Sequence, residues 1–249
     1  MPSFAISLIV FVCLFGGAEF GILFSGALPH DHLNADSGSA VKLGMGLVAT
    51  MSALVLGLLV SSAKSFYDTQ NTELTDISAK IVVLGRVLAR YGPEAKDARD
   101  FLRTFVAGSL NKIWPRERGR ASPESADTDE EAFVDRVHTL SPKDDTQRAL
   151  KAQAVSMALA LGQTRWLMVA QQANSVSKPM LVVLVFWLTV LFIRFGLYAP
   201  HNATVTAAFF FAALSVSGAI FLILEMYTPY AGIIHISSAA LRGALAHLA

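Results

Sequence analysis

The stretch that decides the fold runs from Val41 to Tyr91, VKLGMGLVATMSALVLGLLVSSAKSFYDTQNTELTDISAKIVVLGRVLARY. No charged residue occurs between Leu43 and Ala63, a run of 21 residues. At 1.5 Å rise per residue, a helix of this length spans the ~30 Å hydrocarbon layer of a bilayer. Helical periodicity continues past Ala63 into charged sequence, so the stretch predicts one helix that crosses a membrane and then extends into water.

The membrane half of this helix carries small and then charged residues at every third or fourth position, which places them on one stripe. This small-residue stripe consists of Gly46, Thr50, Ala53, Gly57, Ser61 and Lys64, and Asp68 continues it. Leucines and a methionine cover other sides of the helix and suit contact with lipid or with apolar partners. We interpret the stripe as the side that faces protein or water.

Beyond the membrane half, apolar residues alternate steps of three and four, the spacing of a coiled coil. This heptad seam consists of Leu74, Ile77, Ile81, Leu84, Leu88 and Tyr91. It stops at Gly92-Pro93, where a glycine suits the position after the helix and a proline cannot continue it. We expect the seam to pack within the subunit or between subunits.

The composition is that of a multi-pass membrane protein, because 53% of the 249 residues are hydrophobic and only 16% are charged. The net charge of +1 argues against nucleic acid as a partner. The single cysteine, Cys13, cannot form a disulfide or a zinc site within the chain. A metal ion could be bound by His30, Asp31, His32 and Asp36. Because these residues lie in a loop without a fixed fourth ligand, an ordinary polar loop is the favoured interpretation, and neither a metal nor a cofactor is expected. No catalytic motif is present, and an enzyme is not expected.

These patterns predict an all-α integral membrane protein with four transmembrane helices, whose long helices extend into a coiled-coil-like cytoplasmic domain. The first helix is interpreted as retained and not as a signal peptide, because no basic residue precedes it and Glu19 interrupts it. The predicted transmembrane helices are at about 4–24, 43–63, 180–197 and 204–226. The chain is predicted to have four parts. Residues 1–63 contain the first two of these helices, and residues 64–178 form the cytoplasmic domain, which includes a mobile loop at 116–129. Residues 179–226 contain the other two helices, and residues 227–249 form a cytoplasmic tail with a short amphipathic helix.

Three boundaries have specific signals. Pro93 suits the first turn of a helix that reaches Trp114 and folds back on the heptad seam. Ser141-Pro142 predicts the start of a long helix, and Asn202 predicts the cap of the fourth transmembrane helix. The polar sequence before the organising helix predicts a loop from Leu28 to Ala40.

The basic residues predict the orientation. Of the 20 Lys and Arg residues, 17 lie between Lys64 and Lys178. The positive-inside rule therefore places this region, and with it both chain termini, in the cytoplasm. The predicted location is the bacterial inner membrane.

Three charged residues lie inside or at the ends of predicted transmembrane helices, where an ionised group is costly. Glu19 and Arg194 lie at comparable depths and could form an ion pair, or Glu19 could line an aqueous path. Glu225 lies near the depth of Lys64 and Lys178, where it could form a structural salt bridge or belong to a charge ring that faces a cytoplasmic vestibule.

Four stretches resemble the bacterial bestrophin-like domain family: VKLGMGLVATMSALVLGLLVSSAKSFYD (41–68), VLARYGPEA (87–95), WLTVLFIRFGLYAPHNATV (187–205) and LILEMYTPYAGIIHISSAALRGAL (222–245). The last stretch is the most specific. Its residues that match the family pattern are Glu225, Pro229, Gly232, Ile236, Ser237, Ser238, Leu241 and Arg242. Tyr227 and Thr228 depart from it, since an Asp-Arg pair is usual there. The resemblance implies four crossings, a cytoplasmic helical middle and a remote kinship with bestrophins, which are oligomeric anion channels.

Two functions follow as hypotheses. The first is an ion channel in which identical subunits, with a pentamer as the candidate number, surround an axis bordered by the small-residue stripe. The kinship slightly favours anions, although Glu19 and Glu225 would favour cations if both were exposed to the pore. The second is a non-conducting scaffold or sensor, whose stripe is helix packing and whose cytoplasmic helices bind a partner. A transporter is less favoured because no internal repeat is found.

Overall fold

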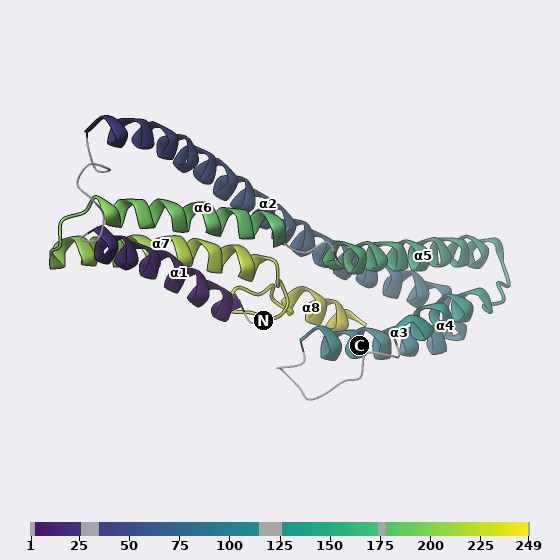
Figure 1. The fold of residues 1–249 in the computed structure, drawn as a ribbon. Helices are drawn as coiled ribbons and strands as arrows, with labels where there is room; N and C mark the ends of the chain where they lie inside the picture. The colour runs from purple at the N-terminus through teal and green to yellow at the C-terminus, as the bar shows by residue number, and fades with distance from the viewer. Residues whose placement is uncertain (1–2, 26–34, 115–125, 174–177, 249) are drawn as a thin grey trace. The chain divides into compact units, whose positions relative to one another are not determined.

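The computed structural model describes residues 3–25, 35–114, 126–173 and 178–248, and these contain helices but no strand. The chain divides into two compact units. Unit 1 comprises residues 1–67 and 176–228, and unit 2 comprises 68–175 and 229–249. The helices are α1 (Ser3–Ser25), α2 (Ala35–Tyr91), η2 (Pro93–Ala95), α3 (Lys96–Ile113), α4 (Ala126–His138), α5 (Asp145–Ala173), α6 (Lys178–Leu197), α7 (Ala203–Met226) and α8 (Ala239–His247) (Figure 1).

Four of the described helices, α1, α2, α6 and α7, are long and apolar enough to cross a membrane. This confirms the all-helical fold class with four candidate membrane spans. Helix α2 is continuous for 57 residues and ends at Tyr91, so it includes the whole predicted helix from Val41 to Tyr91. Gly92 follows with a φ of 125°, a left-handed conformation that other residues rarely adopt.

Helices α1, α6 and α7 form the core of unit 1, where α1 packs against both of the others. The buried residues of this core are Val10, Leu14, Ala18, Phe192, Ala213, Ile220 and Leu224. Phe11 and Phe15 of α1 each meet the ring of Phe210 edge-on, with centroids 5.4 and 5.7 Å apart. A second cluster joins Leu59 and Ala63 of α2 to Leu184 of α6 and Ile223 of α7.

The contact between α1 and α6 depends on glycine. A Cβ atom built on Gly21 would lie 2.2 Å from the carbonyl oxygen of Ile193, and one on Gly196 would lie 2.1 Å from that of Ala18. Neither position can hold a side chain unless the helices separate. Such close backbone approach through small residues is how transmembrane helices gain van der Waals contact where lipid supplies no hydrophobic driving force.

Five of the six residues of the heptad seam are buried inside unit 2, and Ile77 is partly buried. Leu74, Ile81, Leu84, Leu88 and Tyr91 are each no more than 2% exposed. Helix α5 runs beside this part of α2 (Figure 1) and is bonded to it where Lys80 Nζ donates to Thr164 Oγ1 at 3.0 Å. The seam therefore packs within the subunit, one of the two alternatives that its spacing left open.

Helix boundaries differ from the prediction at three places. Helix α2 begins at Ala35 and not after Ala40, because Asp36 falls in the first turn, where the helix dipole favours a carboxylate. Helix α4 begins at Ala126, so the predicted loop 116–129 does not reach 129, and Asp127 and Asp129 occupy a first turn for the same reason. The rest of that loop lies outside the described residues.

The third difference is the start of α5, which lies at Asp145 and not at Ser141-Pro142. Here Asp144 Oδ1 accepts a hydrogen bond from the backbone N–H of Gln147 at 2.7 Å. A carboxylate in this position satisfies a helix donor that would otherwise have no partner. The predicted cap at Asn202 is confirmed, because its Oδ1 accepts from the N–H of Val205 at 2.8 Å.

Replacing Gly196 with Ala should destabilise unit 1, because the added methyl group meets a backbone oxygen that cannot move independently. We expect a loss of about 1–3 kcal/mol, the usual cost of overpacking. Gly218→Ala in α7 is the matched control, since a Cβ there has no atom within 4 Å and alanine favours a helix. Thermal unfolding in detergent measures both. Equal melting temperatures for the two variants would contradict the close α1–α6 contact.

Candidate functional site

The small-residue stripe lies on the uncovered side of α2. All six predicted members, Gly46, Thr50, Ala53, Gly57, Ser61 and Lys64, are exposed within the subunit. A Cβ atom on Gly46 or on Gly57 would have no neighbour within 4 Å. The hydroxyl of Thr50 donates to the carbonyl of Gly46 at 2.9 Å, which leaves its oxygen lone pairs on the outside of the helix. Among the described residues of one subunit, the two glycines of the stripe have no neighbour over them.

The opposite side of the membrane half of α2 packs on the other helices of unit 1. Ser52, Leu59 and Ala63 are buried there, and the Ser52 hydroxyl donates to the carbonyl of Val48 at 2.8 Å. Only 11% of the most apolar window of α2 is buried, against 22–39% for the other three candidate spans. Helix α2 is therefore the least covered of the four.

Tyr227, which directly follows α7, contacts α2. Its hydroxyl lies 3.0 Å from the Ser62 hydroxyl, and its ring stacks on Phe66 with centroids 5.2 Å apart. Tyr227 is one of the two residues that depart from the family pattern. Helical spacing could not have identified this contact, because it joins residues that are 165 positions apart.

Glu225 is buried in the last turn of α7 and only 5% exposed. Lys64, in contrast, is exposed at one end of the stripe. The two charges therefore differ in their access to water within the subunit.

Glu19 and Arg194 do not form the predicted ion pair in the subunit. Among the described residues, no hydrogen bond or salt bridge joins them, and Glu19 Oε1 and Arg194 Nε are buried without a hydrogen-bond partner. The Arg194 guanidinium instead lies 5.1 Å from the centre of the Tyr198 ring. The reason is geometric: glycines and their neighbours occupy the α1–α6 contact line, and Glu19 and Arg194 lie off that line.

Unit 2 contains a polar cluster that the sequence did not predict, formed by Gln70, Glu73, Gln171 and Tyr230. Gln70, which is fully buried, donates from Nε2 to Gln171 Oε1 at 2.9 Å and accepts from the Tyr230 hydroxyl at 3.2 Å. Gln171 Nε2 donates to Glu73 Oε1 at 2.8 Å. Burial raises the pKa of the Tyr230 hydroxyl above its ordinary value, so it stays protonated and remains a donor.

The same region holds the C-terminal segment that carries the family pattern. Trp114 Nε1 donates to the carbonyl of Ile236 at 3.0 Å, and the Trp114 ring meets Tyr230 edge-on. The N–H of Ile236 donates to the carbonyl of Pro229 at 2.7 Å, which closes the segment into a loop. The sequence carries no specific signal for these contacts. It shows only that Gln70 is a polar residue, and Trp114 an aromatic residue, next to apolar helix faces.

Metal ligation finds no support in the part of the chain that the structure describes. No group of three or more His, Cys, Asp or Glu side chains gathers there. His30, Asp31 and His32 lie outside the described residues. Unit 1 therefore contains an apolar helix with an uncovered stripe, and unit 2 contains a buried seam and a polar cluster.

The family model for the Bestrophin-like domain matches residues 12–241. The chain belongs to the Bestrophin-like domain family. Its fold is similar to that of a mutant of a bacterial Bestrophin homolog from Klebsiella pneumoniae, with 14% identity and a TM-score of 0.70 over 100% of this chain and 97% of that one. A second mutant of that homolog gives 13% identity and a TM-score of 0.67 over 97% of both chains.

A further structure, described as a membrane protein, gives 13% identity and a TM-score of 0.69, covering 97% of this Bestrophin-like chain and 96% of the other. No curated protein sequence matches the chain. At these identities the structural neighbours establish the fold. Together with the four apolar helices, the family indicates a membrane location for this Bestrophin-like protein.

Glu19→Gln and Arg194→Gln should change the free energy of unfolding additively, within about 0.5 kcal/mol, because residues without a shared contact do not couple. Denaturation of the two single variants and the double variant in mixed micelles measures this. Ser62→Ala with Tyr227→Phe is a positive control, since their hydroxyls are 3.0 Å apart and should couple. A coupling energy of 1 kcal/mol or more, by the same principle, would mean that Glu19 and Arg194 meet in the assembled protein.

Proposed function

We propose that this Bestrophin-like protein is one subunit of a homo-oligomeric ion channel, in which the small-residue stripe of α2 borders the axis. The observation that carries the proposal is the exposure of the whole stripe. Gly46, Thr50, Ala53, Gly57 and Ser61 are exposed on the subunit, and a Cβ atom at either glycine would have no neighbour within 4 Å among the described residues. Small and hydroxylated side chains leave room for ions and offer oxygen atoms to them.

An oligomer follows from the same exposure. The stripe lies on the outer surface of one subunit, so a single chain does not surround a path with it. Several copies around an axis would turn each stripe towards the centre and place the leucines beside it between subunits or against lipid. The kinship with bestrophins, which are oligomeric channels, supports this arrangement, and a pentamer is the stoichiometry that we propose.

Anion permeation is the selectivity that we propose, because of where the charges lie. Lys64 is exposed at one end of the stripe, whereas Glu225 is buried inside the subunit. Glu19 belongs to α1 and not to the stripe helix. The cation preference that both carboxylates would confer on a pore therefore loses its main support. Asp68 continues the stripe beyond Lys64, so the proposal of anions rests on the kinship with bestrophins together with the charge of Lys64.

The location and orientation are also proposals. The excess of Lys and Arg between residues 64 and 178 supports a cytoplasmic position for unit 2, with both termini on the same side. In a bacterium this corresponds to the inner membrane. The heptad helices would then form a cytoplasmic helical domain around the axis.

The alternative function is a non-conducting membrane scaffold or sensor, whose helices in unit 2 bind a partner. The exposed stripe also supports this alternative, because small residues let the helices of two subunits pack closely. The two functions differ in what occupies the space beside the stripe. In the channel it is water and ions, and in the scaffold it is another helix.

Purified protein in liposomes should dissipate an imposed chloride gradient, and Gly57→Trp should abolish this flux while the oligomer stays intact. A bulky ring at the centre of the stripe would fill a narrow axis, and the Cβ atom that carries it would have no described atom within 4 Å. Leu58→Trp is the matched control, because residue 58 is also exposed but points about 100° away around the helix. Flux assays beside size-exclusion chromatography measure both properties.

The outcomes separate the two functions. Loss of the oligomer in Gly57→Trp would show that the stripe packs on another helix, as the scaffold requires. No flux from correctly assembled wild-type protein, over a range of pH and calcium concentration, would also favour the scaffold. Equal block by the two tryptophans would mean that the stripe does not define the path.

Lys64→Glu should lower the ratio of anion to cation permeability, because it replaces the positive charge at the end of the stripe by a negative one. The ratio follows from reversal potentials in planar bilayers under a potassium chloride gradient. Lys64→Arg keeps the charge and should retain the wild-type ratio. An unchanged ratio in Lys64→Glu would place Lys64 away from the ion path.

A further inference from the structure

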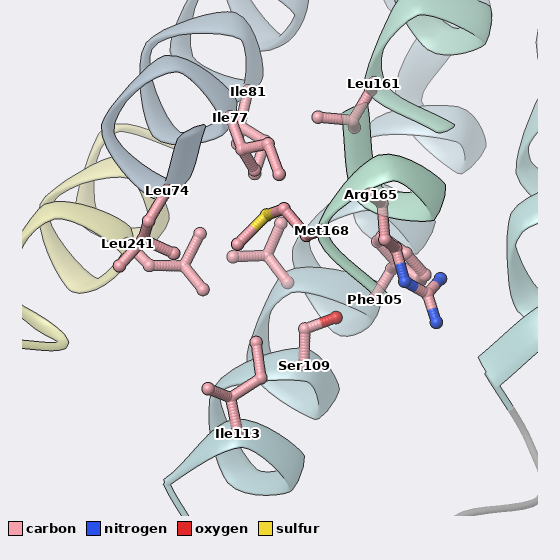
Figure 2. A pocket seen from close by; sticks show the side chains of 11 residues that line it. Leu74, Ile77, Ile81, Phe105, Ser109, Ile113, Leu161, Arg165, Met168 and Leu241 are labelled. Carbon is pink, nitrogen blue, oxygen red and sulfur yellow. The ribbon is translucent and has the colours of Figure 1, made fainter. Parts of the chain in front are cut away.

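Among the described residues, three arginines lie over aromatic rings, and they differ in what else they contact. Arg136 lies 4.1 Å from the centre of the Phe101 ring and also pairs with Asp97 at 3.5 Å. Arg165 lies 5.6 Å from the centre of the Phe105 ring, beside an apolar cavity of about 80 Å³ in unit 2, and has a further interaction. Figure 2 shows its guanidinium turned away from the centre of that cavity. Both of these arginines are therefore occupied by other groups.

Arg194, the third arginine, has only its ring contact. It lies in the last turn of α6, with its guanidinium 5.1 Å from the centre of the exposed Tyr198 ring. Its Nε is buried without a hydrogen-bond partner, and no described residue accepts from its terminal nitrogens. Those nitrogens are not among the buried atoms, so they reach the surface of the subunit. A guanidinium has five N–H donors, and here they require an acceptor from outside the subunit.

The position of Arg194 along α6 places its charge near one edge of a bilayer. The candidate membrane span of α6 has 19 residues and ends at Leu197. At 1.5 Å rise per residue it covers about 28 Å, close to the ~30 Å hydrocarbon layer. Arg194 precedes the end of the span by less than one turn, so its long side chain can bring the charge to the head-group region. Tyr198 is an aromatic residue of the kind enriched at this boundary.

The side chains at this end of unit 1 are apolar and aromatic. Phe195 is exposed next to the arginine on α6. A Cβ atom on Gly21 would lie 3.0 Å from the backbone nitrogen of Leu197, so this part of α1 is level with the end of α6. Here Phe20 and Phe24 are exposed and stacked, with ring centroids 5.5 Å apart. A ligand that joins an anionic group to alkyl chains matches both the unpaired guanidinium and these exposed rings.

We propose that Arg194 and Tyr198 bind the phosphate group of a membrane phospholipid, whose acyl chains lie against Phe195 and along α6. The Tyr198 ring covers one face of the guanidinium, and the terminal N–H groups in its plane can donate to two phosphate oxygens. Glu19, the carboxylate at a comparable depth, does not take this place, because no hydrogen bond or salt bridge joins it to Arg194. The proposal depends on the membrane location of this Bestrophin-like protein and not on ion flux.

The test is a titration of the full-length protein in detergent with dimyristoylphosphatidylglycerol, followed by native mass spectrometry. Dimyristoylglycerol, which has the same acyl chains and no phosphate, should bind at least about five-fold more weakly, the usual contribution of one basic residue near a membrane surface. Inorganic phosphate should not displace the phospholipid, because it lacks the acyl chains.

Variants separate the charge from the ring. Arg194→Gln should weaken phosphatidylglycerol binding about five-fold and leave dimyristoylglycerol binding unchanged. Arg194→Lys should fall between Arg194→Gln and the wild type, since a point charge replaces the planar fork. Tyr198→Phe keeps the ring and should retain binding, whereas Tyr198→Leu should weaken it. Arg103→Gln, the same change at an exposed position of α3, is the matched control and should have no effect.

A photoreactive phosphatidylglycerol with a diazirine in its head group locates the site on the wild-type protein, even if thermal unfolding shows that Arg194→Gln is not folded. Labels should fall within residues 195–202. Labels confined to other peptides would overturn the proposal, as would equal binding of the two lipids, displacement by inorganic phosphate or an equal effect of Arg103→Gln. A changed oligomer with unchanged lipid binding in Arg194→Gln would instead mean that Arg194 contacts a neighbouring subunit. Ion flux is measured separately, so the channel hypothesis stands or falls on its own.

Discussion

The structure depends on one constraint, which is that a single helix must meet two different environments along its length. In unit 1, α2 buries Ser52, Leu59 and Ala63 and leaves the small-residue stripe uncovered. In unit 2 the same helix buries Leu84 and Leu88 almost completely. The change in pattern follows from the solvent: lipid gives apolar side chains no reason to be buried, whereas water does. The stripe and the seam are the two surfaces by which one helix suits these two environments.

The core of unit 1 explains why the stripe is left free. Gly21 and Gly196 bring α1 and α6 to backbone contact, and α7 completes this group through Ala213 and Ile220. These three helices bury one another, so α2 adds only one side to the group. A helix with an uncovered small-residue surface in a membrane suits contact with further copies of the chain or with water. Both the channel and the scaffold hypotheses begin from this property of the subunit.

Unit 2 combines tight and loose packing. The polar cluster around Gln70 satisfies a fully buried amide through Gln171 and Tyr230, and the loop closed between Pro229 and Ile236 is bonded to Trp114. Buried polar groups with all partners in place specify one arrangement of the helices that supply them. Beside this cluster the seam leaves a cavity at Leu74, Ile77 and Ile81, where four helices meet without filling the space. A unit built in this way has a defined helix register next to an unfilled space.

The sequence by itself determined the helical class, the four apolar helices, the burial of the seam, the end of α2 at Gly92 and the cap at Asn202. Each of these depends on residues within a few turns of one another, where period, charge and backbone preference act directly. The tertiary structure alone decided that Glu19 and Arg194 are not partners within the subunit, that Tyr227 meets Ser62 and Phe66, and that Gln70 belongs to a buried cluster. It also decided that the stripe is exposed. These facts depend on how helices distant in sequence rotate against each other, and close contacts such as that of Gly196 with Ala18 set this rotation.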